Sequence, residues 1–361
     1  MNDRTKSFLK HAYKQFYFSK AHTIEFPPDM ESREFGYIPF DGSMVRHISF
    51  RSPGEAVAEL LKQTPSSVYC SNARYNAPTL PMDEKGWNGA ELIFDIDSTD
   101  IPTPCKKGHD IWYCTNCWKV GRLPKPTKCP DCASGVAEFK GTCEICLGAS
   151  KDHAERVIGF LTDDFGVSRK DINVYFSGNR GYHLHVFDNR FDMLEQGARA
   201  EIADYLRGDS LPSIQTLASV FRRKSVGGET SSGWMKKIAI QVAQRRQGYA
   251  GTIQKLVSEA ISSQRALVDA SVTTDIHRVF RLAGTLHGNT GMCKKRVMTL
   301  DDFDPMIEAV VLSPEPVRIQ VTVYPRFTMN GVTFGPYKST IVTLPAYAAV
   351  PILARGMGEA A

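Results

Sequence analysis

The sequence predicts an α+β fold, in which strands and helices follow one another irregularly along 361 residues. Three observations support this prediction. A strand-like apolar run at 91–97 and a β-rich hairpin at 172–188 enclose a helical pattern at 151–166. Residues 193–267 are mostly helical in pattern. The last part of the chain, from 317–327 onward, returns to strand-like alternation.

Composition sets the outer limits of the protein. With 42% hydrophobic residues the chain can form one large or two ordinary domains. No apolar run approaches the ~18 residues of a membrane span, so we expect no membrane association. The net charge of +5 is compatible with a polyanionic partner without requiring one. The N-terminal segment lacks the apolar stretch of a secretion signal, which predicts a reducing, cytoplasmic location.

The elements can be justified in chain order from local signals. Ser52-Pro53-Gly54-Glu55 is typical of a helix start and predicts a helix from about Pro53 to Lys62. The helix at 151–166 should stop at Gly166. In the hairpin, the glycines of the turn 177–181 let the backbone turn tightly and approach a ligand. The helical region 193–267 should be broken by a loop at 225–233.

Two aspartates end the strand at 91–97. The period of two in a strand points Asp95 and Asp97 to the same face. Adjacent carboxylates repel each other unless divalent cations lie between them, and hard oxygen ligands suit Mg²⁺ or Mn²⁺. A solvated strand end is the alternative, and for the short Asp-x-Asp string alone it is the better explanation.

Eight cysteine and histidine residues then follow within a short stretch, at the spacing of zinc ligands. They are Cys105, His109, Cys114, Cys117, Cys129, Cys132, Cys143 and Cys146. Disulfides are the alternative, but they do not persist in a reducing compartment. Eight ligands make two tetrahedral sites, and we expect Cys114, Cys117, Cys129 and Cys132 to form an inner ribbon while the other four hold its base. Four protein ligands per ion leave no open position, which predicts structural zinc.

The hairpin offers a cation and two imidazoles. Arg180 in the turn and His183 in the strand would suit a triphosphate beside the acidic pair. The alternative for His183 is an ordinary sheet residue, and His183 with His185 also matches the spacing of zinc hydrolases.

Further along, residues 268–291 add a third acid, Asp269, followed by Arg278, Arg281 and His287. Asp275 is a competing acid, although its position before an expected helix gives it an ordinary role as a helix cap.

Taken in order, these motifs resemble those of a known family. They are ELIFDID, the Cys and His knuckle, FSGNRGYHLHVF and VDASVTTDIHRVFRLAGTLHGNTG. This series is similar to the catalytic small subunit of archaeal and eukaryotic DNA primase. REFGYIPF, MVRHISF, KGWNGAELIFDID and GVTFGPYKSTIVTLPAYAAVPIL resemble the archaeal branch, so the likeness spans nearly the whole chain.

The resemblance implies a primase-type mixed α/β core of two small sheets flanked by helices, with a zinc-binding insertion and a helical insertion. The core would comprise residues 1–100, 147–192 and 266–361. Residues 101–146 would form the zinc-binding insertion and residues 193–265 the helical one.

The resemblance also implies roles for individual residues. Asp95, Asp97 and Asp269 match the metal-binding triad. The residues that match phosphate-contacting or nucleotide-contacting positions are Arg46, Ser177, Arg180, His183, Arg281 and His287. Asn179 stands where the family more often has a second basic residue. The family has one zinc knuckle, so the segment from Cys114 to Cys132 is an additional ribbon.

As a primase, the chain would join nucleoside triphosphates on a single-stranded DNA template by two-metal transfer, using Mg²⁺ or Mn²⁺ beside structural Zn²⁺. A large primase subunit would be its heterodimer partner, and the location would be cytoplasmic and nucleoid-associated. A primase-polymerase active mainly in extension, lesion bypass or end joining is the nearest alternative. A non-catalytic zinc protein that binds nucleic acid and a zinc hydrolase built on His183 and His185 are the others.

Overall fold

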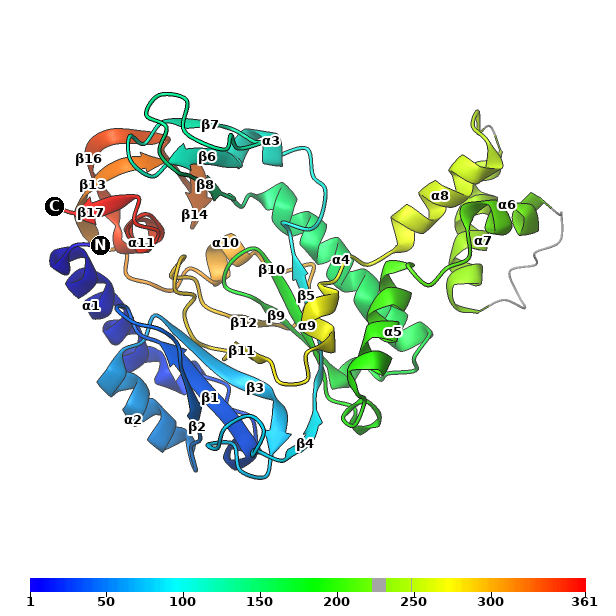
Figure 1. Cartoon of the computed structure of the whole chain (residues 1–361), viewed down its shortest axis with the longest axis horizontal. Coiled ribbons are helices and arrows are strands. Elements are labelled where there is room, and N and C mark those ends of the chain that lie inside the picture. The colour runs from blue at the N-terminus through cyan, green and yellow to red at the C-terminus, as the bar shows by residue number, and fades with distance from the viewer. Residues whose placement is uncertain (223–231, 248) are drawn as a thin grey trace.

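Two antiparallel sheets form the centre of the computed structural model, which describes residues 1–222, 232–247 and 249–361 (Figure 1). The first sheet has the order β11-β3-β1-β2, with β4 paired to β3, and the second has the order β12-β9-β10-β5. Their strands are β1 Arg33–Ile38, β2 Val45–Ile48, β3 Ser67–Tyr75, β4 Trp87–Ala90, β5 Leu92–Asp97, β9 Ile172–Phe176, β10 Gly181–Val186, β11 Val279–Arg281 and β12 Lys295–Val297. The α+β prediction, the strand at 91–97 and the hairpin at 172–188 are thereby confirmed.

The second sheet has one apolar face and one polar face. Along β5, Leu92, Phe94 and Ile96 are fully buried, while the aspartates between and after them are partly exposed. Helix α4, Glu144–Asp163, packs against β5 and β10. Since successive strand residues point to opposite faces, the aspartates lie with Ile93 on the face turned away from Leu92, Phe94 and Ile96. That polar face is turned toward the first sheet, because residues of both sheets line the cavities between them.

Helix α4 begins earlier than predicted. The sequence pattern places its start near residue 151, but the helix begins at Glu144 with Cys143 as its cap residue. The first turn places Cys143 and Cys146, three residues apart, on the side that faces the other members of the thiol cluster. The residues of this turn therefore serve the cluster and do not form the apolar pattern by which a helix is recognised in a sequence. The helix ends at Asp163, and the chain then turns through Gly166, whose φ is +64°.

The two ends of the chain lie together on one side of the body (Figure 1). Helix α1, Asp3–Lys20, starts where the Asn2 side chain accepts the Thr5 N–H at 2.8 Å. The hydroxyl of Thr5 accepts the main-chain N–H of Ala360 at 2.9 Å, which ties the first helix to the last strand. Helix α2, Pro53–Gln63, is capped by Ser52, as the sequence predicts.

The C-terminal part returns to strands and adds a small apolar layer beside α1. Its elements are α10 Pro305–Glu308, β13 Pro316–Tyr324, β14 Phe327–Met329, β15 Val332–Phe334, β16 Tyr337–Pro345, α11 Ala346–Ala354 and β17 Gly358–Ala360. Strand β13 lies between β16 and β17, and α11 packs on all three strands.

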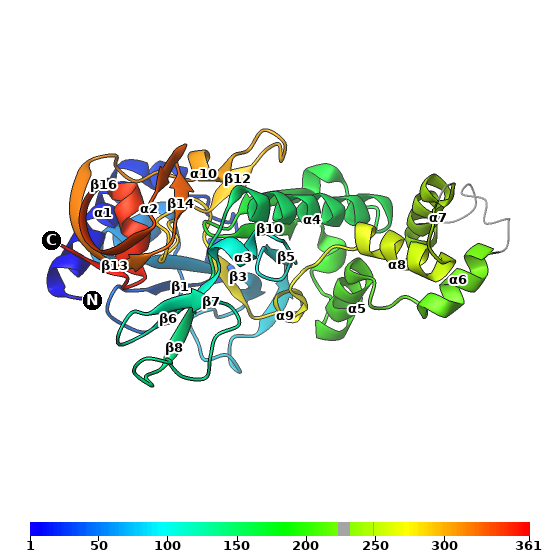
Figure 2. The same cartoon turned by 90° about the horizontal axis from the view of Figure 1, so that it is seen from above.

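The region between β10 and β11 is helical, as predicted. Its helices are α5 Gln196–Arg207, α6 Ile214–Arg222, α7 Gly233–Arg246, α8 Ile253–Gln264 and α9 Ala270–Thr274. Helix α5 packs on α9, whereas α6, α7 and α8 pack on one another and extend away from the sheets (Figures 1 and 2). The loop predicted at 225–233 lies, apart from its last two residues, outside the described part of the chain.

The cysteine-rich segment forms a three-stranded sheet of its own. It contains α3 Lys106–His109, β6 Ile111–Cys114, β7 Val120–Arg122 and β8 Val136–Phe139, in the order β7-β6-β8. Across the described residues, none of the helices combines the length and apolar character that crossing a membrane requires.

Candidate active site and metal centres

Three aspartates gather at one end of the second sheet. Asp95 and Asp97 extend from the same face of β5, and Asp269 is the cap residue of α9, which packs against β5. The carboxylate of Asp269 accepts the N–H of Ser271 at 2.9 Å and its hydroxyl at 2.7 Å. Burial, followed by the charges of Asp97 and Asp269, raises the pKa of Asp95 to about 7. The cluster is therefore unfavourable when fully ionised, although the charges of Arg278 and Lys294 offset part of the repulsion.

The turn between β9 and β10 approaches these acids closely. Arg180 Nη2 donates to Asp97 Oδ2 at 3.2 Å, and His183 Nε2 lies 3.5 Å from Asp95 Oδ1. The register explains both contacts, because His183 pairs with Asp95 across the strands and Gly181 pairs with Asp97.

Both glycines of the turn are required by close packing. A Cβ on Gly181 would lie 1.8 Å from the carbonyl oxygen of Ile96, so a side chain there is incompatible with the pairing of β10 with β5. Gly178 has a φ of +84°, and its Cβ would lie 3.0 Å from the Met292 oxygen and 3.1 Å from the Cβ of His287. The turn is therefore held between the acidic strand and the segment that carries His287.

A cavity of about 180 Å³ collects most of the predicted site residues. Those that line it are Asp95, Asp97, Ser177, His183, Arg281 and His287, together with Tyr69 and Arg278. Arg180 and Asp269 flank it through their contacts with Asp97 and β5. One wall is therefore acidic, and the facing groups are the cations and imidazoles that bind phosphates.

The two cavity histidines are neutral. Burial, with nearby lysine and arginine charges, holds the pKa of His183 and of His287 well below the usual value. The main-chain N–H of Asn289 donates to His287 Nδ1 at 3.1 Å, so the ring proton of His287 lies on Nε2. In His183 the buried Nδ1 has no hydrogen-bond partner within the described residues. Nε2 of His287 can therefore donate to an additional ligand.

Arg46 is not brought to this cavity. It lies on β2, where Nε and Nη2 donate to the two carboxylate oxygens of Glu34 at 2.8 and 3.2 Å. Glu34 is fully buried and also accepts from Lys85 at 2.6 Å. Arg46 thus belongs to a separate buried ion cluster.

Asp275 differs from expectation in its local role. It ends α9 instead of starting a helix, because the chain continues into β11. Its carboxylate accepts the N–H of His277 at 2.9 Å and so stabilises a turn. The helix cap is Asp269.

Sequence reasoning missed a buried chain of charged groups behind the acids. His185 Nδ1 lies 3.2 Å from Glu91 Oε2, and its Nε2 lies 3.2 Å from Lys294 Nζ. Arg33 pairs with Glu91 on the other side. Both nitrogens of His185 are therefore occupied by protein groups, which argues against a zinc hydrolase site on His183 and His185. Lys294 is 1% exposed, and no local signal distinguishes it from Lys295 and Arg296 in the same basic run.

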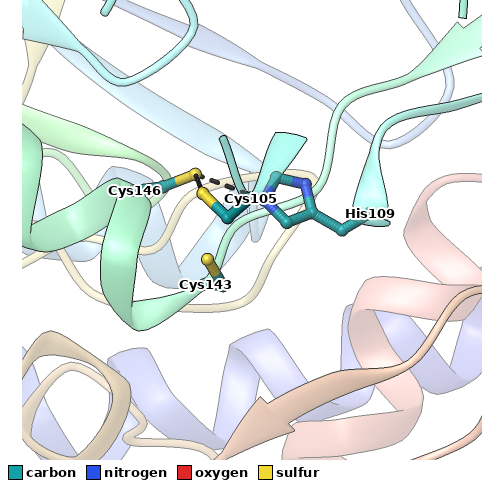
Figure 3. A group of neighbouring side chains, drawn as sticks. All are labelled: Cys105, His109, Cys143 and Cys146. Atoms are coloured by element: carbon teal, nitrogen blue, oxygen red, sulfur yellow. Dashed lines mark hydrogen bonds between the residues drawn. The ribbon is translucent and has the colours of Figure 1, made fainter. Parts of the chain in front are cut away.

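The first cysteine and histidine group lies between α3 and the start of α4. Cys105, His109, Cys143 and Cys146 point toward one another, with their ligand atoms within 4.8 Å of each other (Figure 3). Cys146 Sγ lies 3.4 Å from Cys105 Sγ and 3.3 Å from His109 Nε2. Asp110 Oδ1, which the sequence analysis did not single out, lies 2.8 Å from His109 Nδ1. A carboxylate in this position orients a metal-binding imidazole.

The second group lies at the tip of the small sheet. Its members are Cys114, Cys117, Cys129 and Cys132, again within 4.8 Å of one another. The main-chain N–H groups of Asn116 and Cys117 each donate to Cys114 Sγ at 3.4 Å, an arrangement that stabilises a thiolate. Two sets of soft ligands, four each and mutually close, fit two zinc ions.

The comparisons of sequence with known proteins agree on one family. The model described as DNA primase small subunit matches residues 127–298. The DNA primase small subunit PriS of Cenarchaeum symbiosum (strain A) is 34% identical over 378 residues, and that of Nitrosopumilus maritimus is 33% identical over 375 residues; each alignment covers 100% of both chains. The polymerase domain of Mycobacterium tuberculosis Ligase D in complex with DNA aligns at a TM-score of 0.35 and 12% identity over 83% of each chain, which is too low to relate the two structures.

Fold, site and relatives together define a replication enzyme, a DNA-directed nucleotidyltransferase. The chain belongs to the DNA primase small subunit family. The small subunit is the catalytic subunit of DNA primase.

Proposed function

We propose that this chain makes short primers de novo on single-stranded DNA from nucleoside triphosphates, with Asp95, Asp97 and Asp269 as its metal-binding acids. The observation that carries the proposal is geometric: Asp95 and Asp97 share one face of β5 and line a cavity together with His183, Arg281 and His287, while the main-chain N–H of Asp269 is bonded to the carbonyl oxygen of Asp95. Crowding of the three carboxylates also raises the pKa of Asp95. A non-catalytic zinc protein has no need of such a costly cluster.

The residues present fit divalent metal ions. Carboxylate oxygens are the ligands that Mg²⁺ and Mn²⁺ prefer, and cations among the three acids would relieve their repulsion. When bound, the metal ions would lower the pKa of the attacking 3′-hydroxyl and neutralise charge on the departing pyrophosphate.

The chain's other groups would bind and orient the triphosphate. Arg281 lies over the ring of Tyr69, with its guanidinium carbon 5.2 Å from the ring centre, and this contact directs its charge along the cavity wall. Neutral His287 would donate from Nε2. Ser177 and His183 line the same cavity. Arg180, whose present partner is Asp97, would exchange that carboxylate for a phosphate once a cation neutralises the acids. Arg46 would reach a nucleotide only by leaving Glu34.

Zinc would be structural in both cysteine groups. Each group supplies four protein ligands, so no position is left for a substrate. The first group would join α3 to the start of α4, which packs behind the catalytic strand.

We also propose the division into a core of residues 1–100, 147–192 and 266–361 with insertions at 101–146 and 193–265. Its support is that every residue assigned to the catalytic cavity comes from the three core segments. The partners would be the template, the nucleotides and a large primase subunit, and the location would be the nucleoid.

The test is template-directed synthesis by the zinc-loaded chain with its large subunit on unprimed single-stranded DNA, with Mg²⁺ or Mn²⁺. We expect short products from the unmodified chain and none from Asp97→Asn. The control, Asp301→Asn, changes a carboxylate that is 85% exposed and should leave synthesis unchanged. Extension of a supplied primer without de novo products would instead favour the primase-polymerase.

A further inference from the structure

A second cavity, of about 330 Å³, lies between the same two sheets beside the catalytic cavity. Strands β5, β9, β10 and β12 line it on one side, β1, β3 and β11 on the other, and residues 25–28 also contribute. It shares Phe280 and Arg281 with the catalytic cavity, but none of the three catalytic aspartates lines it. Its volume lies in the range of small-molecule sites, roughly 300–1,000 Å³.

A buried lysine in this cavity lacks an anionic partner. Lys294 is 1% exposed, and its Nζ contacts His185 Nε2 at 3.2 Å and lies 4.9 Å from the centre of the Tyr175 ring. Within the described residues no carboxylate forms an ion pair with it, although a lysine is almost never fully buried without one. Burial and then the charge of Arg281 lower the pKa of Lys294 to about 7, so an anion bound in the cavity would favour the charged form of the lysine. An ammonium group has three donors, and the described residues supply one hydrogen-bond partner for them, His185.

The charges around Lys294 favour an anion. Arg281 and Arg296 line the same cavity, and Arg281 lacks a carboxylate partner in the described chain. Glu91, a buried acid of the lining, is already paired with Arg33 and His185. Glu25 is the remaining carboxylate of the lining, and it accepts from the Tyr175 hydroxyl at 3.1 Å.

The lining also includes five aromatic rings and one buried acceptor that has no donor among the described residues. The aromatic side chains are Phe26, Tyr175, His185, Phe187 and Phe280. His185 stacks on Phe187 with their planes 18° apart. Asn72 is 2% exposed, and its Oδ1 has no hydrogen-bond partner among the described groups. Aromatic faces beside an acceptor suit a flat ring with an amino or N–H group.

We propose that this cavity binds a nucleotide separate from the substrate nucleotide. Its phosphates lie on Lys294 and Arg296, because Arg281 serves the substrate nucleotide in the catalytic cavity, and its base lies among the aromatic side chains near Asn72. The ligand differs from the substrate because the base of the substrate must stay free to pair with the template. The proposal does not depend on primer synthesis, since binding is measured without template.

The experiment is equilibrium dialysis of labelled ATP with Mg²⁺ against the full zinc-loaded chain. We expect two ATP molecules per chain. Phe187→Ala with Arg296→Glu should weaken the second site about tenfold or more, because it removes a stacking face and reverses a charge. Both side chains are exposed, so folding should be kept. Arg180→Ala with His287→Ala should instead remove the catalytic-cavity molecule and leave the second one bound.

The matched control is Met298→Ala with Arg318→Glu, which changes an exposed apolar residue and an exposed arginine outside both cavities. Separate titrations measure the affinity for adenosine, for inorganic phosphate and for AMP, which combines the two. AMP should bind more tightly than either of the others. One ATP per chain, or two that survive the Phe187 and Arg296 changes, would overturn the proposal.

Discussion

The main-chain N–H of Asp269 donates to the carbonyl oxygen of Asp95 at 2.9 Å. This bond joins the start of α9 to the catalytic strand, although the two residues are far apart in the sequence. It explains why a third carboxylate is held next to the pair on β5. The repulsion among the three carboxylates lowers the free energy of unfolding, which can be measured.

Asp95→Asn should stabilise the metal-free protein at pH 8. The pKa of Asp95 is raised to about 7 in the folded chain, against about 3.9 when unfolded, so the folded state binds the additional proton and stability falls as the pH rises from about 4 to 7. Asparagine does not ionise, so it removes this fall in the free energy of unfolding, which is on the order of 2 kcal/mol for a partly exposed side chain. The gain should be present at pH 8 and absent below about pH 4, as measured by urea unfolding.

Adding Mg²⁺ should stabilise the unmodified chain and have little effect on the Asp95→Asn chain, which should also lose primer synthesis. Asp301→Asn serves again as the exposed control. Equal stability of the two proteins at pH 8, or primers made by a folded Asp95→Asn chain, would contradict the role given to Asp95.

Features with a local signal could be predicted from the sequence. Ser52 and Pro53 start a helix through their own side chains, and period two along β5 places Asp95 and Asp97 on one face whatever surrounds the strand. The order of motifs predicted a third acid and a set of phosphate-contacting groups. Six of the nine residues named in this way line one cavity, and their roles in binding stay predictions.

Features set by tertiary contacts could not be predicted. The start of α4 depends on the thiol cluster, and the burial of Lys294 depends on how the two sheets face each other. Arg46 shows the same limit, because its partner Glu34 is chosen by the pairing of β1 with β2 and not by any pattern near residue 46. Asp110 adjoins His109 in the sequence, but only the ring orientation shows that it contacts Nδ1.

Gly181→Ala should disrupt the catalytic sheet. The new Cβ would lie 1.8 Å from the oxygen of Ile96, so β10 must separate from β5 at the pair that includes Asp97. We expect a loss of about 2–4 kcal/mol of unfolding free energy and of primer synthesis. Gly159→Ala is the matched control, since its Cβ would meet nothing within 4 Å in the interior of α4. That change should stabilise the chain by about 0.5–1 kcal/mol. Similar stability of the two variants would show that β10 and β5 tolerate separation.

Asp110→Asn should weaken the first zinc site and leave the second unchanged. The carboxylate accepts from His109 Nδ1 and from the Gly141 N–H at 3.0 Å, so it fixes the imidazole with Nε2 toward the thiols. Loss of such a contact costs about ten- to a hundredfold in metal affinity. Competition with a chromogenic chelator should show one of two zinc ions released earlier. Asp131→Asn, an exposed change near the second group, should release neither ion early. If the Asp110 variant released its zinc ions as the unmodified chain does, the contact of Asp110 with His109 would not contribute to zinc affinity.

His287→Ala should lower kcat/KM for nucleotides by about ten- to a hundredfold, the effect of losing a hydrogen bond to a charged group. Because burial holds the pKa of His287 well below its usual value, we expect the ring to be neutral, with its proton on Nε2, from about pH 6 upward. The ratio of the unmodified to the variant kcat/KM should therefore be constant between about pH 6 and 9. His11→Ala, an exposed change on α1, should leave kcat/KM unchanged. If the ratio of unmodified to variant kcat/KM grew as the pH fell toward 6, the phosphates would bind a protonated imidazole. That result would contradict the role of neutral His287 as a hydrogen-bond donor.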